Sequence, residues 1–163
     1  ATITATAIPI GADRSPTWPP GIAGSITHTA EVAACVVARA VDVSALGIDL
    51  ERARAVQPEI WDGVLTKLEA ATLAAKPEAE RSALATLIFS AKEAFFKMQY
   101  PLTKQWVDFH AAEVAVRETD GTFELVCTES TVTRLLGRRA FAGRYAVGPG
   151  LIVTAMHLIA PEK

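Results

Sequence analysis

The chain has little of what marks several common classes of protein. Two of its 163 residues are cysteines and three are histidines, too few for a disulfide framework and too scattered for a zinc site. The formal net charge is −2, so the chain as a whole is not drawn to nucleic acid or to an anionic membrane. Half of the residues are hydrophobic, which is typical of one globular domain with a sizeable core.

No hydrophobic run suits a bilayer. The most apolar stretch, residues 33–50, contains Arg39, Asp42 and Asp49, and a membrane interior disfavours such charges. Residues 1–5 have no basic group ahead of an apolar run, as a signal peptide would have. We therefore expect a cytoplasmic protein that contacts neither a membrane nor nucleic acid.

The two cysteines and two of the histidines predict structural roles. Cys35 and Cys127 each lie among aliphatic residues, so both are expected to be small buried hydrophobic side chains. A disulfide between them is possible but not implied. His110 and His157 stand alone in the sequence and suggest no site.

The hydrophobic pattern predicts strands on both sides of a helical centre. Helices are expected over 58–75 and 79–99, and Tyr100-Pro101 should end the second one because the residue before proline avoids the α region. Strands are expected over 2–10, 25–29, 33–40, 43–50, 106–116, 123–127, 141–147 and 151–159, with 33–40 and 43–50 buried. The fold class is therefore α+β.

The segment Phe89–Lys97, Phe-Ser-Ala-Lys-Glu-Ala-Phe-Phe-Lys, places a carboxylate between two lysines on an apolar helix. Glu93 and Lys97 could form an exposed ion pair on a polar helix edge, worth only about 0.3–0.5 kcal/mol. However, the three phenylalanines of the segment leave no broad solvated face. Ionised groups beside a core need partners, so the segment also suggests a functional site.

A second acidic element lies upstream in Gly47–Glu51, Gly-Ile-Asp-Leu-Glu. Asp49 and Glu51 are two residues apart, a spacing that puts both carboxylates on one face of a strand. If both approach Glu93, the three like charges need a cation. Magnesium fits best because it prefers oxygen ligands and is often shared with phosphates, and manganese is possible. Nearby lysines would hold an anion, so the pattern points to phosphate chemistry.

His28 lies in Ser25-Ile26-Thr27-His28, behind a proline-rich loop. A single histidine on a strand is more often structural than functional. Hydroxyl and imidazole donors in one short segment would, however, also suit a phosphate. Both interpretations remain open from the sequence alone.

Four arginines, Arg134, Arg138, Arg139 and Arg144, fall in a late stretch with no acidic residue between them. Four cations on one surface could dock an acidic partner. The alternative is a solvated loop and strand edge.

Taken together, these segments resemble a known family. Ser25–His28, Gly47–Glu51 and Phe89–Lys97 look like the three signature motifs of the 4′-phosphopantetheinyl transferases, and most resemble the siderophore-synthase-associated, enterobactin-type group. Trp18-Pro19-Pro20-Gly21 and Tyr100-Pro101-Leu102-Thr103 also look like that group. The resemblance extends from about Pro9 to the C-terminus.

The resemblance implies a reaction and its substrates. Such enzymes move the 4′-phosphopantetheine arm of coenzyme A to a serine of an apo acyl or peptidyl carrier protein and release adenosine 3′,5′-bisphosphate. The carriers would belong to nonribosomal peptide, polyketide or siderophore synthases. The fold would be a pseudo-twofold pair of mostly antiparallel halves, here about 1–78 and 79–163, each with a long helix. A monomer is expected.

The resemblance also implies roles for single residues. Asp49, Glu51 and Glu93 would hold magnesium with the pyrophosphate, and Glu93 would be the base for the carrier serine. Lys97, with Lys92 nearby, would contact the phosphates. The 3′-phosphate would bind Thr27 and His28, with Arg14 from the preceding loop as a further ligand, and the pantetheine arm would lie along Phe96 and Trp106.

The chain departs from the family at its start. Members usually have several dozen more N-terminal residues, including a basic helix that helps to bind the adenine end of coenzyme A. We therefore expect an incomplete first half and an opened cofactor pocket. The alternative function is a module that binds coenzyme A or the carrier without turnover. If the chain were a purely structural domain, the three motifs would have to occur in this order by chance.

Overall fold

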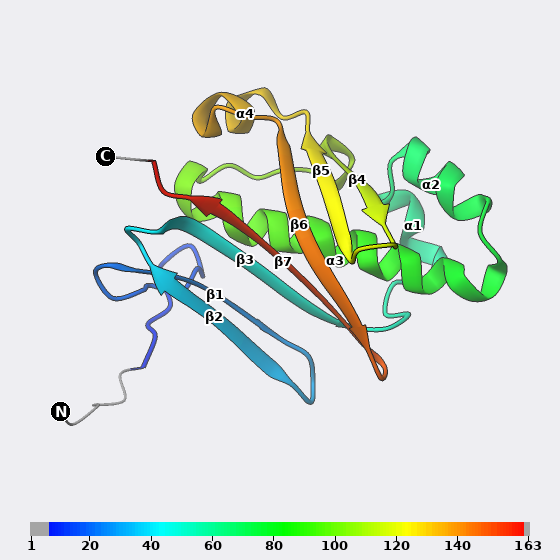
Figure 1. Ribbon diagram of the computed structural model, residues 1–163, viewed down its shortest axis with the longest axis horizontal. Helices are drawn as coiled ribbons and strands as arrows, with labels where there is room; N and C mark the ends of the chain where they lie inside the picture. The colour runs from blue at the N-terminus through cyan, green and yellow to red at the C-terminus, as the bar shows by residue number, and fades with distance from the viewer. Residues whose placement is uncertain (1–6, 162–163) are drawn as a thin grey trace.

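A five-stranded antiparallel sheet lies at the centre of the fold, and one long helix crosses one of its faces (Figure 1). The computed structural model describes residues 7–161. The α+β class predicted from the sequence is confirmed. In spatial order the strands are β3 (Val43–Arg52), β7 (Leu151–Ile159), β6 (Ala140–Gly148), β5 (Thr122–Cys127) and β4 (Ala112–Arg117).

The last two strands form the predicted hairpin. Gly148 pairs with Leu151 at its tip, and Gly150 has a φ of 76°, a backbone conformation that favours glycine. Buried and exposed positions alternate along β7, so one face of the hairpin packs against the helix layer. β7 also pairs with β3, which places strands from both ends of the chain in one sheet.

The long helix α3 (Glu78–Thr103) contains the predicted helix 79–99. Its buried side chains Ala91, Phe95 and Met98 recur at steps of three and four residues and face the sheet. The predicted end at Tyr100 is wrong, because Pro101 lies within the last turn. The helix ends instead at Lys104, which is left-handed and donates its N–H to the carbonyl of Tyr100 at 2.9 Å. This is the one long helix among the described residues.

The region expected to be one helix over 58–75 is interrupted. It forms a 3₁₀ turn at Pro58–Ile60, then α1 (Trp61–Val64) and α2 (Lys67–Ala74). The break follows from Leu65, which is extended, and from Thr66, which caps α2 in a reciprocal pair of hydrogen bonds with Glu69.

Other expectations need local corrections. The strand expected over 106–116 is irregular at first, with a 3₁₀ turn at Phe109–Ala111 before β4. A short helix, α4 (Ser130–Leu136), was not expected. The expected strand 2–10 lies mostly outside the described residues, and of its described part only Ile10 forms an isolated bridge, with Pro16.

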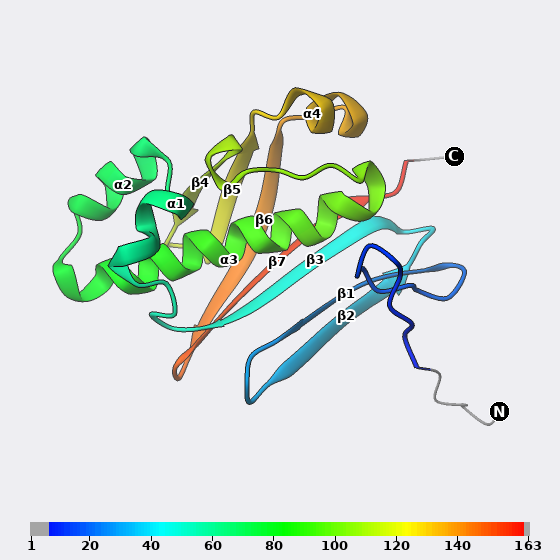
Figure 2. The ribbon, with the colours of Figure 1, turned by 180° about the vertical axis from the view of Figure 1, so that it is seen from behind.

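Strands β1 (Ile22–His28) and β2 (Ala33–Arg39) form a separate two-stranded antiparallel sheet beside β3 (Figures 1 and 2). The expectation that 33–40 is buried is wrong, since no residue of β2 is fully buried and Cys35 is exposed. β2 pairs with β1 along one edge. Backbone pairing does not cover the faces of a strand, and the side chains of β2 are exposed on one face and half-buried on the other. Cys127 is buried as expected, and both cysteines are free.

Two hydroxyl groups join the small sheet to the large one. The Oγ of Ser25 accepts the backbone N–H of Ile48 at 3.1 Å, and the Oγ1 of Thr27 accepts that of Leu50 at 3.1 Å. β3 is an edge strand, so these hydroxyls satisfy amide groups that no neighbouring strand reaches. β1 is thereby fixed against β3 through side chains.

None of the helices within residues 7–161 is long and apolar enough to cross a membrane. This agrees with the charges in the most apolar stretch of the sequence.

Gly47 should be indispensable for the packing of α3 on β3. A Cβ atom at this position would lie 1.9 Å from the carbonyl oxygen of Ala94, a backbone atom that cannot move alone. We expect Gly47→Ala to lower the free energy of unfolding by about 1–3 kcal/mol or more, measured by chemical denaturation. Gly63→Ala is the matched control, because nothing lies within 4 Å of its Cβ. Equal stability of the two variants would contradict this packing.

Candidate active site between α3 and β3

A cavity of about 530 Å³ opens between β1, the start of β3 and the C-terminal half of α3. The N-terminal loop closes one side. Its lining is mostly apolar, with a few charged groups at the rim, as in pockets that bind extended organic ligands. The lining includes Arg14, Trp18, Ile26, Phe96, Lys97 and Trp106.

Three aromatic side chains form one wall of the cavity. Phe96 packs edge-on against Trp106 with ring centroids 5.0 Å apart, and its ring lies 5.1 Å from that of Tyr100. Trp106 is nonetheless 74% exposed. The wall therefore offers an apolar surface to a ligand, and Trp106 also remains open to solvent.

An ion pair holds the N-terminal loop at the end of α3. The ammonium of Lys104 lies 2.8 Å from the carboxylate of Asp13. This hydrogen bond, together with one from Ser15, keeps the pKa of Asp13 well below its usual value. Arg14 follows with a φ of 65°, a strained conformation for a residue other than glycine, and lines the cavity. The structure thus places Arg14 at the cavity, and its contact with a 3′-phosphate stays a prediction.

Asp49 is the buried centre of the site. Its Oδ1 accepts hydrogen bonds from the ammonium of Lys97 at 2.6 Å and from the hydroxyl of Thr27 at 3.2 Å. Its Oδ2 is buried and has no partner among the described residues. A buried carboxylate oxygen without a partner is costly, so this atom is suited to a cation.

The other two predicted carboxylates lie near enough to Asp49 for its charge to shift their pKa. Burial raises the pKa of Glu93, and the charge of Asp49 raises it further while Lys97 lowers it. Burial likewise raises the pKa of Glu51, and both Asp49 and Glu93 add to that shift. The three carboxylates therefore repel one another and would each gain from a shared cation.

The three carboxylates do not form a preformed metal site. No group of three His, Cys, Asp or Glu side chains within residues 7–161 is close enough to hold a metal ion. The ammonium of Lys97 neutralises Asp49. The donor set still fits magnesium, because it combines hard oxygen ligands, mutual repulsion and an unpartnered buried oxygen.

Thr27 and His28 face opposite ways. Thr27 is buried, and its hydroxyl is engaged by Asp49 and by the amide of Leu50. It points toward β3, which contradicts its expected role as a phosphate ligand. His28 is exposed and shares the face of β1 on which Ile26 lines the cavity. Of the two, only His28 is free to meet a ligand.

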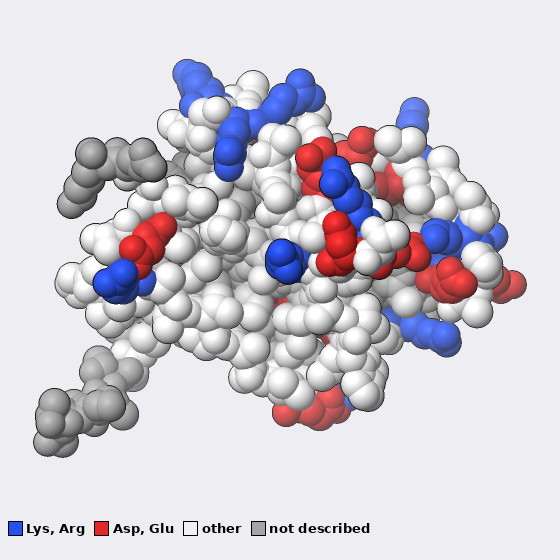
Figure 3. Space-filling model, viewed as in Figure 1, with Lys and Arg blue, Asp and Glu red and all other residues white. Residues whose placement is uncertain are grey.

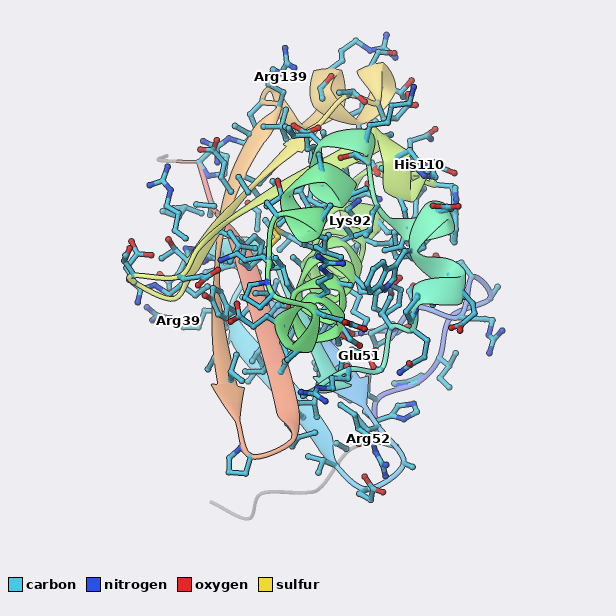
Figure 4. The ribbon with its side chains drawn as sticks, turned by 90° about the vertical axis from the view of Figure 1, so that its right-hand side faces the viewer. Arg39, Glu51, Arg52, Lys92, His110 and Arg139 are labelled. Carbon is cyan, nitrogen blue, oxygen red and sulfur yellow. The ribbon has the colours of Figure 1, made fainter. Side chains whose placement is uncertain are left out.

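The expected role of Lys92 as a phosphate contact also needs correction. Its ammonium is bound by Glu69 at 2.7 Å and by the carbonyl oxygens of Val64 at 2.7 Å and Phe109 at 2.9 Å. Its side chain is 1% exposed, and burial lowers its pKa. Figure 4, seen along α3, places Lys92 and Glu51 on different sides of the helix. Lys92 therefore cannot contact phosphates at the cavity.

Glu69 is the residue that sequence reasoning missed. Its two oxygens accept the backbone N–H groups of Thr66 and Val114 as well as the ammonium of Lys92. It fixes α2, α3 and β4 together, and so sets the rotation of α3 that turns Glu93 and Lys97 toward β3. The signal was present in the sequence as a capping box, Thr66-Lys67-Leu68-Glu69.

Comparison with known families agrees with this arrangement. A model of the 4′-phosphopantetheinyl transferase superfamily matches residues 45–147, and a model of the 4′-phosphopantetheinyl transferase N-terminal domain matches residues 1–38. The chain belongs to the 4′-phosphopantetheinyl transferase superfamily. The superfamily match spans the two acidic motifs, and the N-terminal match includes the segment with His28.

Several relatives align with most of the chain. It is 39% identical to the 4′-phosphopantetheinyl transferase Svp of Streptomyces mobaraensis, over 93% of this chain and 62% of that protein. It is 33% identical to the 4′-phosphopantetheinyl transferase PptT of Mycobacterium tuberculosis, over 91% of this chain and 67% of that protein. The chain thus spans about two thirds of the length of these relatives.

Solved structures support the fold. The complex of ACPS with coenzyme A from Chronobacterium ammoniagenes matches 72% of this chain and 97% of its own, with a TM-score of 0.56 and 17% identity. Holo-ACP synthase from Plasmodium yoelii gives the same TM-score at 15% identity. At these identities the likeness establishes the fold alone.

The sign of the Glu93 shift predicts how stability depends on pH. Because burial raises its pKa in the folded chain above the usual 4.5, ionised Glu93 destabilises the fold at higher pH. We expect Glu93→Gln to be more stable than the parent protein at pH 8. The difference should vanish below the usual pKa, where both states carry a proton. Denaturation at a series of pH values measures this, and a difference that grows as pH falls would contradict it.

Removing the Lys92 ammonium should unfold the region around α2. Lys92→Met leaves Glu69 as an uncompensated buried charge, which typically lowers the free energy of unfolding by about 3–5 kcal/mol. The double variant Lys92→Met with Glu69→Gln should recover much of this loss in chemical denaturation, because the amide carries no charge. If both variants lose the same stability, the ion pair is not the cause.

Proposed function

We propose that the chain transfers the 4′-phosphopantetheine group of coenzyme A to a serine of an apo acyl or peptidyl carrier protein in a magnesium-dependent reaction. The observation that carries this proposal is the Asp49–Lys97 ion pair, whose lysine lines the apolar cavity and whose charges act on the carboxylate of Glu93. An anion-binding cation, a candidate base and a candidate metal-binding carboxylate thus lie near one another. The similarity to the 4′-phosphopantetheinyl transferases Svp and PptT supports the same activity.

The reaction is a displacement at phosphorus. The serine oxygen of the carrier forms a bond to the phosphorus that bears the pantetheine. The bond from that phosphorus to the bridging oxygen breaks, and adenosine 3′,5′-bisphosphate leaves with the electron pair. The serine proton passes to the carboxylate of Glu93, directly or through water. The raised pKa of Glu93 makes it a stronger base than an exposed glutamate.

Lys97 neutralises the charge that develops on the phosphates. Its side chain is 27% exposed and lines the cavity, so its ammonium can contact a bound anion. Positioning and charge neutralisation supply most of the catalysis in such transfers. Thr27 helps to position Asp49, the partner of Lys97, because its hydroxyl donates a hydrogen bond to the Asp49 carboxylate.

Asp49, Glu51 and Glu93 are the residues that would hold magnesium. When bound, the ion neutralises phosphate oxygens and so favours attack by the serine. The unpartnered Oδ2 of Asp49 is the observation that favours such a ligand. Manganese has the same ligand preference.

Coenzyme A would lie in the cavity with its phosphates at the rim. Lys97 and Arg14 line the cavity, and His28 continues the face of β1 from Ile26. The pantetheine arm would then lie on the aromatic wall of Phe96 and Trp106. A siderophore-type grouping is part of the proposal, supported by 42% identity over 90 residues to enterobactin synthase component D of Escherichia coli, 54% of this chain and 41% of that protein.

The intact mass of an apo peptidyl carrier domain tests the function. After incubation with the chain, coenzyme A and magnesium, the carrier should gain the mass of one phosphopantetheine, and a chelator should prevent the gain. Glu93→Gln should reduce the rate by about 10²-fold or more, because the base is lost.

Glu124→Gln is the matched control, since Glu124 is exposed on β5 and makes the same change of charge. It should transfer at the parent rate. Binding of coenzyme A without any gain of carrier mass by the parent chain would refute the transferase and favour a binding module.

A further inference from the structure

A buried pair of hydroxyl groups joins α3 to β7 beside the candidate active site. The hydroxyls of Ser90 and Thr154 lie 2.8 Å apart, and the Thr154 hydroxyl also donates to the backbone carbonyl of Ser90 at 2.8 Å. Both residues are 0% exposed. The core between helix and sheet is otherwise largely apolar, so a polar pair at this place needs a reason other than hydrophobic packing.

The direction of each hydrogen bond in the pair follows from the number of protons. A carbonyl oxygen only accepts, so the single proton of the Thr154 hydroxyl goes to the carbonyl of Ser90. The contact between the two hydroxyls must then use the proton of Ser90. Both hydroxyl protons are thus engaged between α3 and β7, and neither is left for another acceptor.

Thr154 lies next to Asp49 in the large sheet. The two residues are partners across the β3–β7 ladder, and both side chains face α3, because each is hydrogen-bonded to a side chain of that helix. Directly opposed residues on one face of a sheet have Cβ atoms about 4.5–5.5 Å apart. The Oδ2 of Asp49 nevertheless has no partner among the described residues. The pair therefore holds α3 beside this carboxylate without donating to it.

The position of Glu93 depends on how the backbone of α3 is held. Neither ion pair of α3 among the described residues involves Glu93. Its neighbours along the helix hold it instead. Ser90, three residues earlier, is bound to β7, and the carbonyl of Ala94, the next residue, packs against Gly47 of β3. The hydroxyl pair and this close approach therefore fix α3 on both sides of Glu93.

The charges that act on Asp49 lie on the side of the sheet that faces α3. Figure 3 shows the opposite face, where the surface over β7 is largely uncharged. On the α3 side, Asp49 is paired with Lys97 and its charge acts on Glu93. A shift of α3 relative to β7 would therefore change both interactions at once.

We infer that Ser90 and Thr154 are positioning residues for the candidate cation site; this inference rests on the proposed function. Their hydroxyls fix the spacing of α3 on β7, and through it the separation of Glu93 from the carboxylate of Asp49. Groups that hold metal ligands in place typically contribute about 10–100-fold to metal affinity. Two apolar side chains of the same size would fill the space but would not fix α3 along the strand, because hydrophobic contact has no preferred direction.

Metal affinity tests the role of the pair without any transfer reaction. In calorimetric titration of the chain with magnesium chloride, with and without coenzyme A, Thr154→Val should raise the dissociation constant for magnesium at least about tenfold. Valine keeps the shape of threonine but loses both hydrogen bonds. Ser90→Ala should act in the same direction, and it carries the test if Thr154→Val does not fold. Thr154→Ser keeps the hydroxyl and should stay within about twofold of the parent value.

Thr86→Val is the matched control. Thr86 lies on α3 one turn before Ser90 and is 0% exposed. Its hydroxyl donates to the carbonyl of Ser82 at 2.8 Å and accepts the N–H of Val56 at 3.1 Å. Loss of this hydroxyl should lower stability in chemical denaturation about as much as loss of the Thr154 hydroxyl. The control should nevertheless keep the parent dissociation constant for magnesium, because its contacts lie outside the candidate cation site.

The outcomes separate this inference from the proposed function. If Thr154→Val and Thr86→Val bind magnesium equally well, the positioning role is wrong, and transfer by the parent chain in the carrier assay would still leave the function standing. A parent chain that binds neither magnesium nor manganese would overturn the positioning role as well.

If magnesium binding weakens in Thr154→Val and Ser90→Ala but not in Thr86→Val, while the parent chain does not transfer, the inference stands and the transferase falls. In a parent chain that transfers, Thr154→Val should raise the apparent KM for magnesium and leave the KM for the carrier domain within about twofold.

Discussion

The buried carboxylate of Asp49 is the point on which the structure depends. It lies on β3, receives a hydroxyl from Thr27 on β1 and an ammonium from Lys97 on α3, and so ties three elements together. A buried charge is tolerated only when it is paired. The same carboxylate keeps one oxygen without a partner, so the group that stabilises the junction is also the one best placed to bind a cation.

The position of α3 follows from contacts on its other sides. Gly47 lets the backbone of α3 approach β3 closely, and the buried pair of Glu69 and Lys92 fixes the rotation of the helix. With distance and rotation both set, Glu93 and Lys97 face β3 rather than solvent. Two adjacent residues of one motif thus have different functions, Lys92 in packing and Glu93 in the candidate site.

Much of the fold was predictable because it rests on local patterns. Alternation predicted the β6–β7 hairpin, and steps of three and four residues predicted the centre of α3. Local rules failed where tertiary packing overrode them. Pro101 was accommodated in the last turn of α3, and the strand of Cys35 proved exposed, because apolar composition does not tell which strand another layer will cover.

By itself the sequence determined the spacing that puts Asp49 and Glu51 on one strand face and Glu93 beside Lys97 on one helix. Only the tertiary structure decided that Lys97 pairs with Asp49 while Lys92 turns away. The physical reason is that side-chain direction follows from local periodicity. Partners distant along the chain depend on how the elements pack.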